Sequence, residues 1–426
     1  MEIVFVHGWS VRSTATYGHL PERLAQETGL KVNHIYLGKY VSFDDAVTLD
    51  DLAQAFDAAI REQAIREMVC ITHSTGGPLV RHWLSRHAGK GHSLRKLIML
   101  APANHGSALA QLGKGRLGRI KAFFESIEPG QKILDWLELG SEEQWELNKQ
   151  WLTFDSLAHG CFPFVLAGDT IDRKFYDHLN SYTGEPGGDG VVRVAAANLN
   201  FEYVRLEQGK GGELAAVRWQ RSPQCALRVV PGAAHGGEEL GILRGIPASG
   251  EHPSYTAILQ ALAVRTEQDY SSLVAQWLGR NRARAPHTMV VFRVKDDTGR
   301  LVEDYDLLLT AGEAASPDDL PEGFFRDRQR NKLHPAKLTY FLDHRKLADL
   351  PIGFIVQARP EKGLVSYSPA AIAPAQLAGV LRPDETLMVE IQLRRMIDRA
   401  CFQLTKNRLP EEIRRDPLGQ PVRKAA

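Results

Sequence analysis

A serine lies among small residues at the end of an apolar run, in Val69-Cys70-Ile71-Thr72-His73-Ser74-Thr75-Gly76-Gly77. The apolar run favours a β-strand, and the residues after the serine favour a helix. A tight strand-to-helix turn of this kind exposes a serine hydroxyl as a nucleophile. The positive end of the following helix then points toward Ser74 and favours an anionic intermediate. The segment departs from Gly-x-Ser-x-Gly at one position, where Thr72 replaces the first glycine.

A serine nucleophile needs a histidine as its base and a carboxylate that fixes the tautomer of that histidine. In the architecture that this turn indicates, the chain order is serine, acid, histidine. His235 follows the last apolar run, Ala226–Val230, in a glycine-rich loop, and we predict that it is the base. His252 is the rival, but it directly precedes a helix and lies farther from a strand end. Most other histidines are expected to be surface or packing residues, including His82, His87, His287 and His334.

Two aspartates compete for the role of the acid. Asp169 lies directly at the end of the run Phe164–Gly168, and strand order alone favours it. Asp189 lies in a tight glycine-rich loop that ends in two valines, Gly187–Val192. The alternative interpretation of Asp189 is a turn aspartate that caps its own backbone. The residues by themselves leave this choice open.

A second glycine turn follows the first predicted strand, at His7-Gly8-Trp9. Glycine lets the backbone turn sharply there, so that a main-chain N–H can face the serine. The N–H of Trp9 and the N–H of Thr75 then form an oxyanion hole with two donors. The alternative is a strand-ending turn with a buried histidine. The turn lies one strand–helix–strand unit before Ser74, and this position favours the oxyanion role.

Strand-like and helix-like segments alternate from residue 2 to about residue 280, and these must position the candidate site. Short apolar strands that alternate with helices indicate a parallel sheet covered on both faces. We therefore predict an α/β fold with a doubly wound, mostly parallel sheet as a catalytic domain over residues 1–282. The predicted strands are Ile3–Val6, Val32–Leu37, Met68–Ile71, Leu97–Leu100, Phe162–Leu166 and Leu227–Val230.

The sheet pattern breaks over residues 108–158, where the segments are helix-like and rich in aromatic residues. An insertion above the carboxyl edge of a parallel sheet is where a lid lies. Its large aromatic residues favour an apolar cleft beneath such a lid. The alternative is a helical subdomain that only completes the core. The aromatic residues in question are Phe123, Phe124, Trp136, Trp145 and Trp151.

A polar link at Arg280–Pro286 separates a second region of different character. Alternating strands and turn residues predict an antiparallel β-sandwich over residues 287–395. Nothing in this region assembles a catalytic set, and we expect it to bind a partner or lipid surface, or to cover the catalytic domain. The basic stretch 396–426 is expected to form a helix and a loose tail.

Composition and charge limit the partners and the cellular location that are expected for this chain. The formal net charge is +1, so no global field attracts nucleic acid or an anionic membrane, and no nucleic-acid partner is expected. No targeting segment precedes the first strand, and no apolar run approaches the about 18 residues of a spanning helix. A cytoplasmic location is the default, with signal-independent export left open. The scattered cysteines are expected to be small buried hydrophobes in a reducing compartment, namely Cys70, Cys161, Cys225 and Cys401.

Five segments together resemble the lipase and esterase branch of the α/β-hydrolase superfamily: Phe5–Trp9, Thr72–Gly76, Ala101–Ser107, Gly188–Val192 and His235. The third is similar to the P-x-x-G-[ST] step after the nucleophile helix of bacterial lipases, and the fourth to their D-G-[LV]-V acid loop. The resemblance spans about residues 2–280. It implies that Asp189 is the acid and that Trp9 and Thr75 supply the oxyanion donors. Thr72 and an added hairpin at Phe201–Arg221 depart from the pattern.

The resemblance implies a serine carboxylic ester hydrolase of the lipase or phospholipase type, which works through a Ser-His-Asp triad and an acyl-enzyme. The expected partner is a small-molecule or lipid ester, with transient contact to a lipid interface, and no cofactor or metal is expected. One alternative is an acyltransferase that uses the same triad. Another is a catalytically inactive hydrolase fold that serves as a binding module, against which the intact Ser74, Asp189 and His235 argue.

Overall fold

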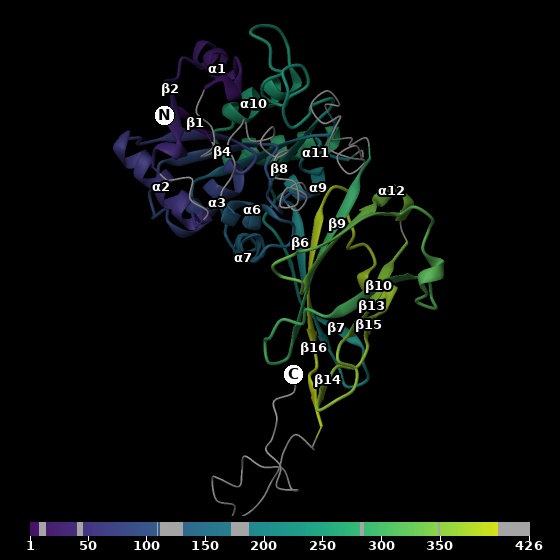
Figure 1. Cartoon of the computed structure of the whole chain (residues 1–426). Coiled ribbons are helices and arrows are strands. Elements are labelled where there is room, and N and C mark those ends of the chain that lie inside the picture. Colours follow the sequence, from purple (N-terminus) through teal and green to yellow (C-terminus); the bar gives the residue numbers. More distant parts are fainter. Residues whose placement is uncertain are drawn as a thin grey trace, which may run out of the picture.

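The computed structural model describes residues 1–7, 14–40, 46–108, 110, 131–171, 187–281, 285–347 and 350–398. Figure 1 shows two regions, with the N-terminal helices and their sheet above and the C-terminal strands below. All structural statements that follow concern these residues.

The N-terminal region is built on a six-stranded sheet in the order β2-β1-β3-β4-β5-β8, and every neighbouring pair is parallel. The predicted α/β fold is therefore confirmed. Because the strands are parallel, their carboxyl ends meet at one edge, where loops can bring distant residues together. The strands are β1 (Glu2–His7), β2 (Val32–Tyr36), β3 (Met68–His73), β4 (Leu94–Leu100), β5 (Phe162–Gly168) and β8 (Ala226–Val230).

Successive side chains of a strand point to opposite faces of the sheet, so the core of this region consists of two buried clusters, one on each face. In β1, Val4 and Val6 belong to one buried cluster, whereas Ile3 and Phe5 belong to another. The first cluster is covered by α2 (Leu49–Glu62), α3 (Gly76–Arg86), α6 (Gln131–Leu137) and α7 (Glu142–Trp151). The second cluster is covered by α1 (Leu20–Thr28), α10 (Pro253–Ala263) and α11 (Glu267–Arg280).

The described part of the predicted lid insertion packs into the core. Trp136, Trp145 and Trp151 are each at most 5% exposed and belong to the same buried cluster as α2 and α3. For residues 131–158 the packing therefore favours the alternative, a helical subdomain that completes the core. These tryptophans are large enough to fill the layer between the sheet and the C-terminal strands, which is why they are not left to line a cleft. Residues 109 and 111–130, with Phe123 and Phe124, lie outside the described residues.

The C-terminal region contains two sheets packed face to face, which confirms the predicted C-terminal β domain. The larger sheet has the order β11-β12-β9-β16-β6-β7, and the smaller has the order β10-β13-β15. Their facing side chains form a third buried cluster. The larger sheet comprises β11 (Phe325–Arg330), β12 (Lys337–Asp343), β9 (His287–Asp296), β16 (Thr386–Leu393), β6 (Phe201–Gln208) and β7 (Leu214–Arg221). The smaller comprises β10 (Tyr305–Ala311), β13 (Ile352–Ala358) and β15 (Ala370–Ile372).

The larger sheet differs from a purely antiparallel one in its central strand. The strand β16 runs parallel to both of its neighbours, β9 and β6. It therefore joins the three antiparallel strands β11, β12 and β9 to the hairpin β6–β7 expected at Phe201–Arg221. That hairpin precedes residue 282 in the chain but completes the sheet formed by the residues after it.

The two regions share a buried layer. One face of the larger sheet contributes Tyr203, Met289, Val291 and Phe341 to the cluster beneath α3 and α7, while the intervening residues face the smaller sheet. Being buried on both faces explains why β12 is buried along its whole length. Trp145 of α7 contacts Tyr203 of β6, with ring centroids 6.4 Å apart, and α7 lies near β6 in Figure 1.

Among the described helices, none combines the length and the apolar character that a membrane crossing requires. The described cysteines Cys70, Cys161 and Cys225 are buried and unbridged, and Cys401 lies outside the described residues. In the predicted C-terminal helix and tail, Met396–Ile397 form the short strand β17, paired with β14 (Val365–Ser366). Residues 399–426 lie outside the described residues.

Candidate active site

Ser74 occupies the turn between the end of β3 at His73 and the start of α3 at Gly76. Its φ is +51°, in the left-handed region that a residue with a Cβ adopts only at a cost. The N–H of Ser74 donates to the carbonyl of Leu100 at the end of β4, at 3.0 Å. A serine held in this strained turn at the carboxyl edge of a parallel sheet is the arrangement of a nucleophile elbow.

The threonine that replaces the first glycine of the pattern fits because a later glycine leaves room for it. Thr72 is fully buried, and a Cβ on Gly76 would lie 3.1 Å from the Cβ of Thr72. A side chain at Gly76 would therefore crowd Thr72, whereas its absence leaves space for the branched residue. A Cβ on Gly77 would lie 2.8 Å from the Cβ of Pro102, so the helix also needs a glycine there.

The predicted base pairs with one of the two candidate acids. Nδ1 of His235 lies 2.9 Å from Oδ2 of Asp189, and both side chains are at most 2% exposed. The other carboxylate oxygen, Oδ1, accepts the N–H groups of Val191 at 3.0 Å and Val192 at 2.7 Å. When Nδ1 donates to the carboxylate, Nε2 is the ring atom that can accept a proton. The geometry therefore suits a histidine that acts as a general base.

Asp169 has a different role in the geometry. Its Oδ1 accepts the N–H of Gly232 at 2.9 Å and the hydroxyl of Thr170 at 3.0 Å. It thus holds the backbone of the loop that carries His235. The structure brings Asp189 to the imidazole, as the resemblance implied and as strand order alone did not. The rival histidine, His252, begins α10, where its Nδ1 accepts the N–H of Ser254 at 3.3 Å.

A glycine that the sequence analysis did not single out makes this pairing possible. A Cβ on Gly168, the last residue of β5, would lie 2.3 Å from the carbonyl oxygen of Ala233 and 3.0 Å from the Cβ of Asp189. The histidine loop and the acid loop therefore both pack directly against the backbone of β5. In the sequence, the signal for this close packing is that Gly168 ends a predicted strand immediately before Asp169.

His73 ties the serine turn to the histidine loop. Its Nε2 donates to the carbonyl oxygen of His235 at 3.0 Å, and the two ring centroids are 4.6 Å apart. Burial, with a further contribution from His235, holds the pKa of His73 well below its ordinary value. His73 is therefore neutral at physiological pH, and it fixes the distance between the residue beside Ser74 and the loop of the base.

Polar side chains brace the segment after β4, which was part of the resemblance. The hydroxyl of Ser107 donates to the carbonyl oxygen of Val191 at 2.7 Å and so holds the acid loop. The fully buried Arg81 of α3 donates to the side-chain oxygens of Asn104 at 3.1 Å and Asn148 at 2.9 Å. Burial lowers the pKa of Arg81 to about 9. These bonds fix α3, and with it the turn at Ser74, against α7.

Of the two predicted oxyanion donors, Thr75 lies within the described residues and Trp9 does not. Thr75 precedes the first residue of α3, where backbone N–H groups have no partner within the helix. His7, at the end of β1, is buried, and its ring stacks on Tyr36 with centroids 4.3 Å apart. The roles of Ser74, Asp189, His235, Trp9 and Thr75 stay predictions that substitutions must test.

A strained serine after a parallel strand, followed in the chain by an acid loop and a histidine loop at the same sheet edge, defines the lipase and esterase class of α/β-hydrolases. No protein-family model and no curated protein matches the chain. The chain is similar to the structure of phospholipase PlaB from Legionella pneumophila, with 42% identity, 99% of each chain covered and a TM-score of 0.87. It belongs to the same family as that protein, which confirms the predicted superfamily.

Two further structures are similar to this chain. One is PlaB from Legionella pneumophila in complex with thio-NAD, at 41% identity over 99% of this chain and all of that one, with a TM-score of 0.85. The other is the lipase BlEst2 from Bacillus licheniformis, at 22% identity over 46% of this chain and 78% of that one, with a TM-score of 0.37. The similarity to PlaB thus spans both regions of the chain.

Proposed function

We propose that this protein hydrolyses the carboxylic ester bonds of phospholipids, with Ser74 as the nucleophile, His235 as the base and Asp189 as the acid. One observation carries the proposal: Ser74 is held at a φ of +51° directly beside His73, whose imidazole donates to the backbone of His235. The substrate class is supported by membership in the family of PlaB, a protein described as a phospholipase.

In the first half of the reaction, Oγ of Ser74 attacks the ester carbonyl carbon while Nε2 of His235 takes the hydroxyl proton. Asp189 stabilises the resulting imidazolium through its bond to Nδ1. The negative charge that develops on the carbonyl oxygen faces the N-terminus of α3, where the N–H of Thr75 is available, with Trp9 as the second donor. His235 then gives its proton to the departing alcohol, and an acyl-enzyme on Ser74 remains.

In the second half, water replaces the alcohol. His235 takes a proton from the water, the resulting hydroxide attacks the acyl carbonyl, and the same donors stabilise the second oxyanion. Collapse of this intermediate returns the proton to Ser74 and releases a fatty acid. Transfer of the acyl group to an alcohol instead of water would use the same residues, so product analysis distinguishes the two reactions.

The experiment supplies the purified protein with vesicles of defined phospholipids in water that carries a heavy oxygen isotope. Mass spectrometry then follows release of lysophospholipid and fatty acid, across a panel of headgroups and acyl lengths. We expect the heavy isotope to appear in the free fatty acid and the Ser74→Ala variant to release none. Acyl esters of an added alcohol in place of fatty acid would indicate an acyltransferase. Turnover of small water-soluble esters with no release from any phospholipid would refute the proposed substrate class.

The lid that the sequence predicted over residues 108–158 has its own test, although the described helices α6 and α7 pack into the core. A lid predicts that activity rises sharply once a short-chain phospholipid passes its critical micelle concentration. Simple saturation across that concentration would show that no lid gates the site. Either result leaves the roles of Ser74, Asp189 and His235 unaffected.

A further inference from the structure

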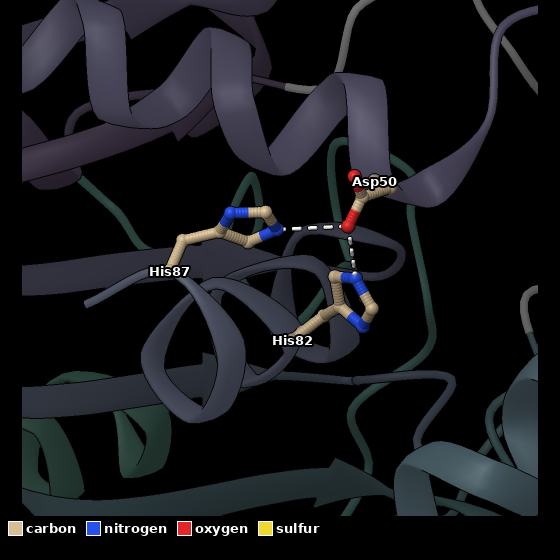
Figure 2. Close-up of side chains that lie close together, drawn as sticks. All are labelled: Asp50, His82 and His87. Carbon is tan, nitrogen blue, oxygen red and sulfur yellow. Dashed lines mark hydrogen bonds and ion pairs between the residues drawn. The ribbon is translucent and has the colours of Figure 1, made fainter. Parts of the chain in front are cut away.

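Three side chains that can bind a metal ion converge between α2 and α3, away from Ser74. Asp50 lies in the first turn of α2, His82 lies in α3, and His87 is the residue that ends α3. Oδ1 of Asp50 lies 3.1 Å from Nε2 of His82 and 2.8 Å from Nε2 of His87. Figure 2 shows both imidazole rings pointing at this single carboxylate oxygen. The three candidate ligand atoms all lie within 4.8 Å of one another.

The convergence of the two histidines is not a consequence of regular helix geometry. Residues five apart on an α-helix point in directions about 140° apart, so they do not share a face. The helix ends at Arg86, and His87 leaves it with a φ of −111°. This break lets the ring of His87 return toward His82, with the two ring centroids 5.8 Å apart.

The partner helix holds the carboxylate firmly. Thr48 and Asp51 form a capping box that fixes the start of α2. The amide of Gln54 donates to Oδ2 of Asp50 at 2.9 Å, so that Oδ1 faces the two imidazoles. Behind the three side chains, Phe56 packs edge-on against Trp83 with ring centroids 5.1 Å apart. The helices are thus packed together independently of any ion, and this packing brings the three donors within 4.8 Å of one another.

Two imidazole nitrogens and one carboxylate oxygen form a donor set suited to borderline divalent ions such as Zn²⁺. Ligands that surround a tetrahedral zinc ion at its usual bond lengths lie about 3.3 Å apart. The separations of 3.1 and 2.8 Å from Asp50 therefore need to widen by a few tenths of an ångström, and the two imidazole nitrogens, which lie within 4.8 Å of each other, need to adjust toward the same spacing of about 3.3 Å, to admit an ion. The side chain of Asp50 is 46% exposed, which leaves solvent access for water as a fourth ligand.

The same contacts shift the pKa values of two of the three side chains. Burial lowers the pKa of His82, and nearby Arg86 lowers it further, against the opposing effect of Asp50. Burial acts to raise the pKa of Asp50, but hydrogen bonds from His82, Gln54 and His87 hold it at about 2.

We propose that Asp50, His82 and His87 form a binding site for one divalent transition-metal ion of the zinc class, which links α2 to α3. His82 lies eight residues beyond Ser74, or about 12 Å along the helix, so the ion does not take part in the ester chemistry. A bound ion stabilises the C-terminal end of α3, the helix whose N-terminal end adjoins Ser74. The site does not depend on the proposed function, because binding can be measured without any substrate.

The test is a titration of the metal-free, full-length protein with Co²⁺, which reports tetrahedral coordination by its visible absorption, followed by competition with Zn²⁺. We expect one tetrahedral Co²⁺ that Zn²⁺ displaces and that Ca²⁺ and Mg²⁺ do not. In the His82→Ala/His87→Ala double variant, affinity should fall on the order of 100-fold or more, and in Asp50→Asn roughly tenfold or more. Zn²⁺ should raise the Tm of the wild type and not that of the double variant.

Two further variants serve as controls. His159→Ala removes an exposed histidine whose ring bonds within its own turn, and it should bind Co²⁺ like the wild type. His34→Ala removes one member of another close histidine pair, with His7. Absence of tetrahedral Co²⁺ in the wild type would overturn the proposal. So would binding that survives in the double variant, or that is lost in His34→Ala and kept in Asp50→Asn. Because Asp50→Asn retains the size of the side chain, it decides the question if the double variant does not fold.

Discussion

The carboxyl edge of the parallel sheet and the layer beneath α7 both bury charged side chains, but they use them differently. At the sheet edge, Asp189 and His235 pair beside a serine whose backbone is strained. Beneath α7, Lys337 is fully buried and pairs with Glu142, and Arg293 binds Glu142 at 2.8 Å. Burial of a charge pair alone therefore does not indicate chemistry. The difference is that a serine with a strained backbone precedes α3 at the edge of the sheet that carries the first pair, whereas the second pair joins a helix to a strand.

The two pairs also join different parts of the chain. Asp189 and His235 come from loops after neighbouring strands of one sheet, and Gly168 lets those loops approach. Glu142 comes from the helical insertion, whereas Lys337 comes from the strand β12 of the C-terminal region. The first pair orients one imidazole, and the second connects two regions that share a buried layer. The first should therefore govern rate, and the second should govern stability.

Removal of the nucleophile should give the largest effect. Ser74→Ala should lower kcat for ester hydrolysis about 10⁶-fold, because the covalent route through the acyl-enzyme is lost. Its stability to urea should change little. Steady-state kinetics with a chromogenic ester measure the effect. Ser272→Ala, which alters an exposed serine of α11, is the matched control and should retain full kcat.

The choice of acid gives the next largest effect. Asp189→Asn should lower kcat about 10³- to 10⁴-fold, because the amide no longer fixes the imidazole in the tautomer that accepts a proton at Nε2. Asp169→Asn should change kcat less than about tenfold, since Oδ1 of Asp169 holds the backbone N–H of Gly232 and the hydroxyl of Thr170. The pair of variants is compared by kcat under saturating ester. The reverse order of effects would show that Asp169 is the acid.

The charge pair beneath α7 should affect stability and not rate. Glu142→Gln leaves Lys337 buried without its charged partner, and we expect the free energy of unfolding to fall by about 2–3 kcal/mol. Urea unfolding measures this change. Glu143→Gln removes an exposed acid from the same first turn of α7 and serves as the control for the helix dipole. Equal losses in the two variants would refute a specific role for the buried pair.

A single carboxyl in the C-terminal region should make stability depend on pH. Burial raises the pKa of Asp384 to about 7, against the effect of a hydrogen bond from the backbone at His287, and Glu385 adds repulsion. Because this folded pKa lies above the unfolded value of about 4, the stability associated with the protonated form is lost as pH rises from about 4 to 7. Asp384 has a φ of +58°, which asparagine also tolerates.

Asp384→Asn should therefore be more stable than the wild type at pH 8, by about 1–2 kcal/mol, with a smaller difference near pH 4. Urea unfolding at both pH values provides the comparison. Asp318→Asn, at an exposed turn, should show no such pH-dependent gain. If the two proteins differ in their free energy of unfolding by the same amount at pH 4 and at pH 8, titration of this carboxyl is not the cause.

The elements of the N-terminal sheet were predictable because their signals are local. Apolar runs such as Met68–Ile71 and Leu227–Val230 lie within β3 and β8, and the motifs at Ser74 and His235 follow them directly. Chain order then placed the motifs at one edge, since parallel strands end on the same side. The acid was harder to choose, because strand order favoured Asp169 and only the resemblance favoured Asp189.

Features that depend on close approach or distant pairing could not be read from the sequence. The room that Gly76 leaves for Thr72 is visible only once the turn is folded. The hairpin β6–β7 joins the C-terminal sheet because β16 inserts beside it, and alternation in either strand cannot reveal its partner. The tryptophans of α7 suggested a cleft, but their neighbours in the C-terminal sheet cover them. These are properties of the assembled layers, and no local pattern encodes them.

Covalent labelling tests most directly whether the strained serine, Ser74, is the nucleophile. The folded protein is treated with a fluorophosphonate, which reacts with an activated serine, and the adduct is located by peptide mass spectrometry. We predict a single adduct on Ser74, which is lost in Ser74→Ala, is retained in Ser272→Ala and forms much more slowly in His235→Ala. An adduct on any other residue, or labelling of Ser74 that does not depend on His235, would contradict the account.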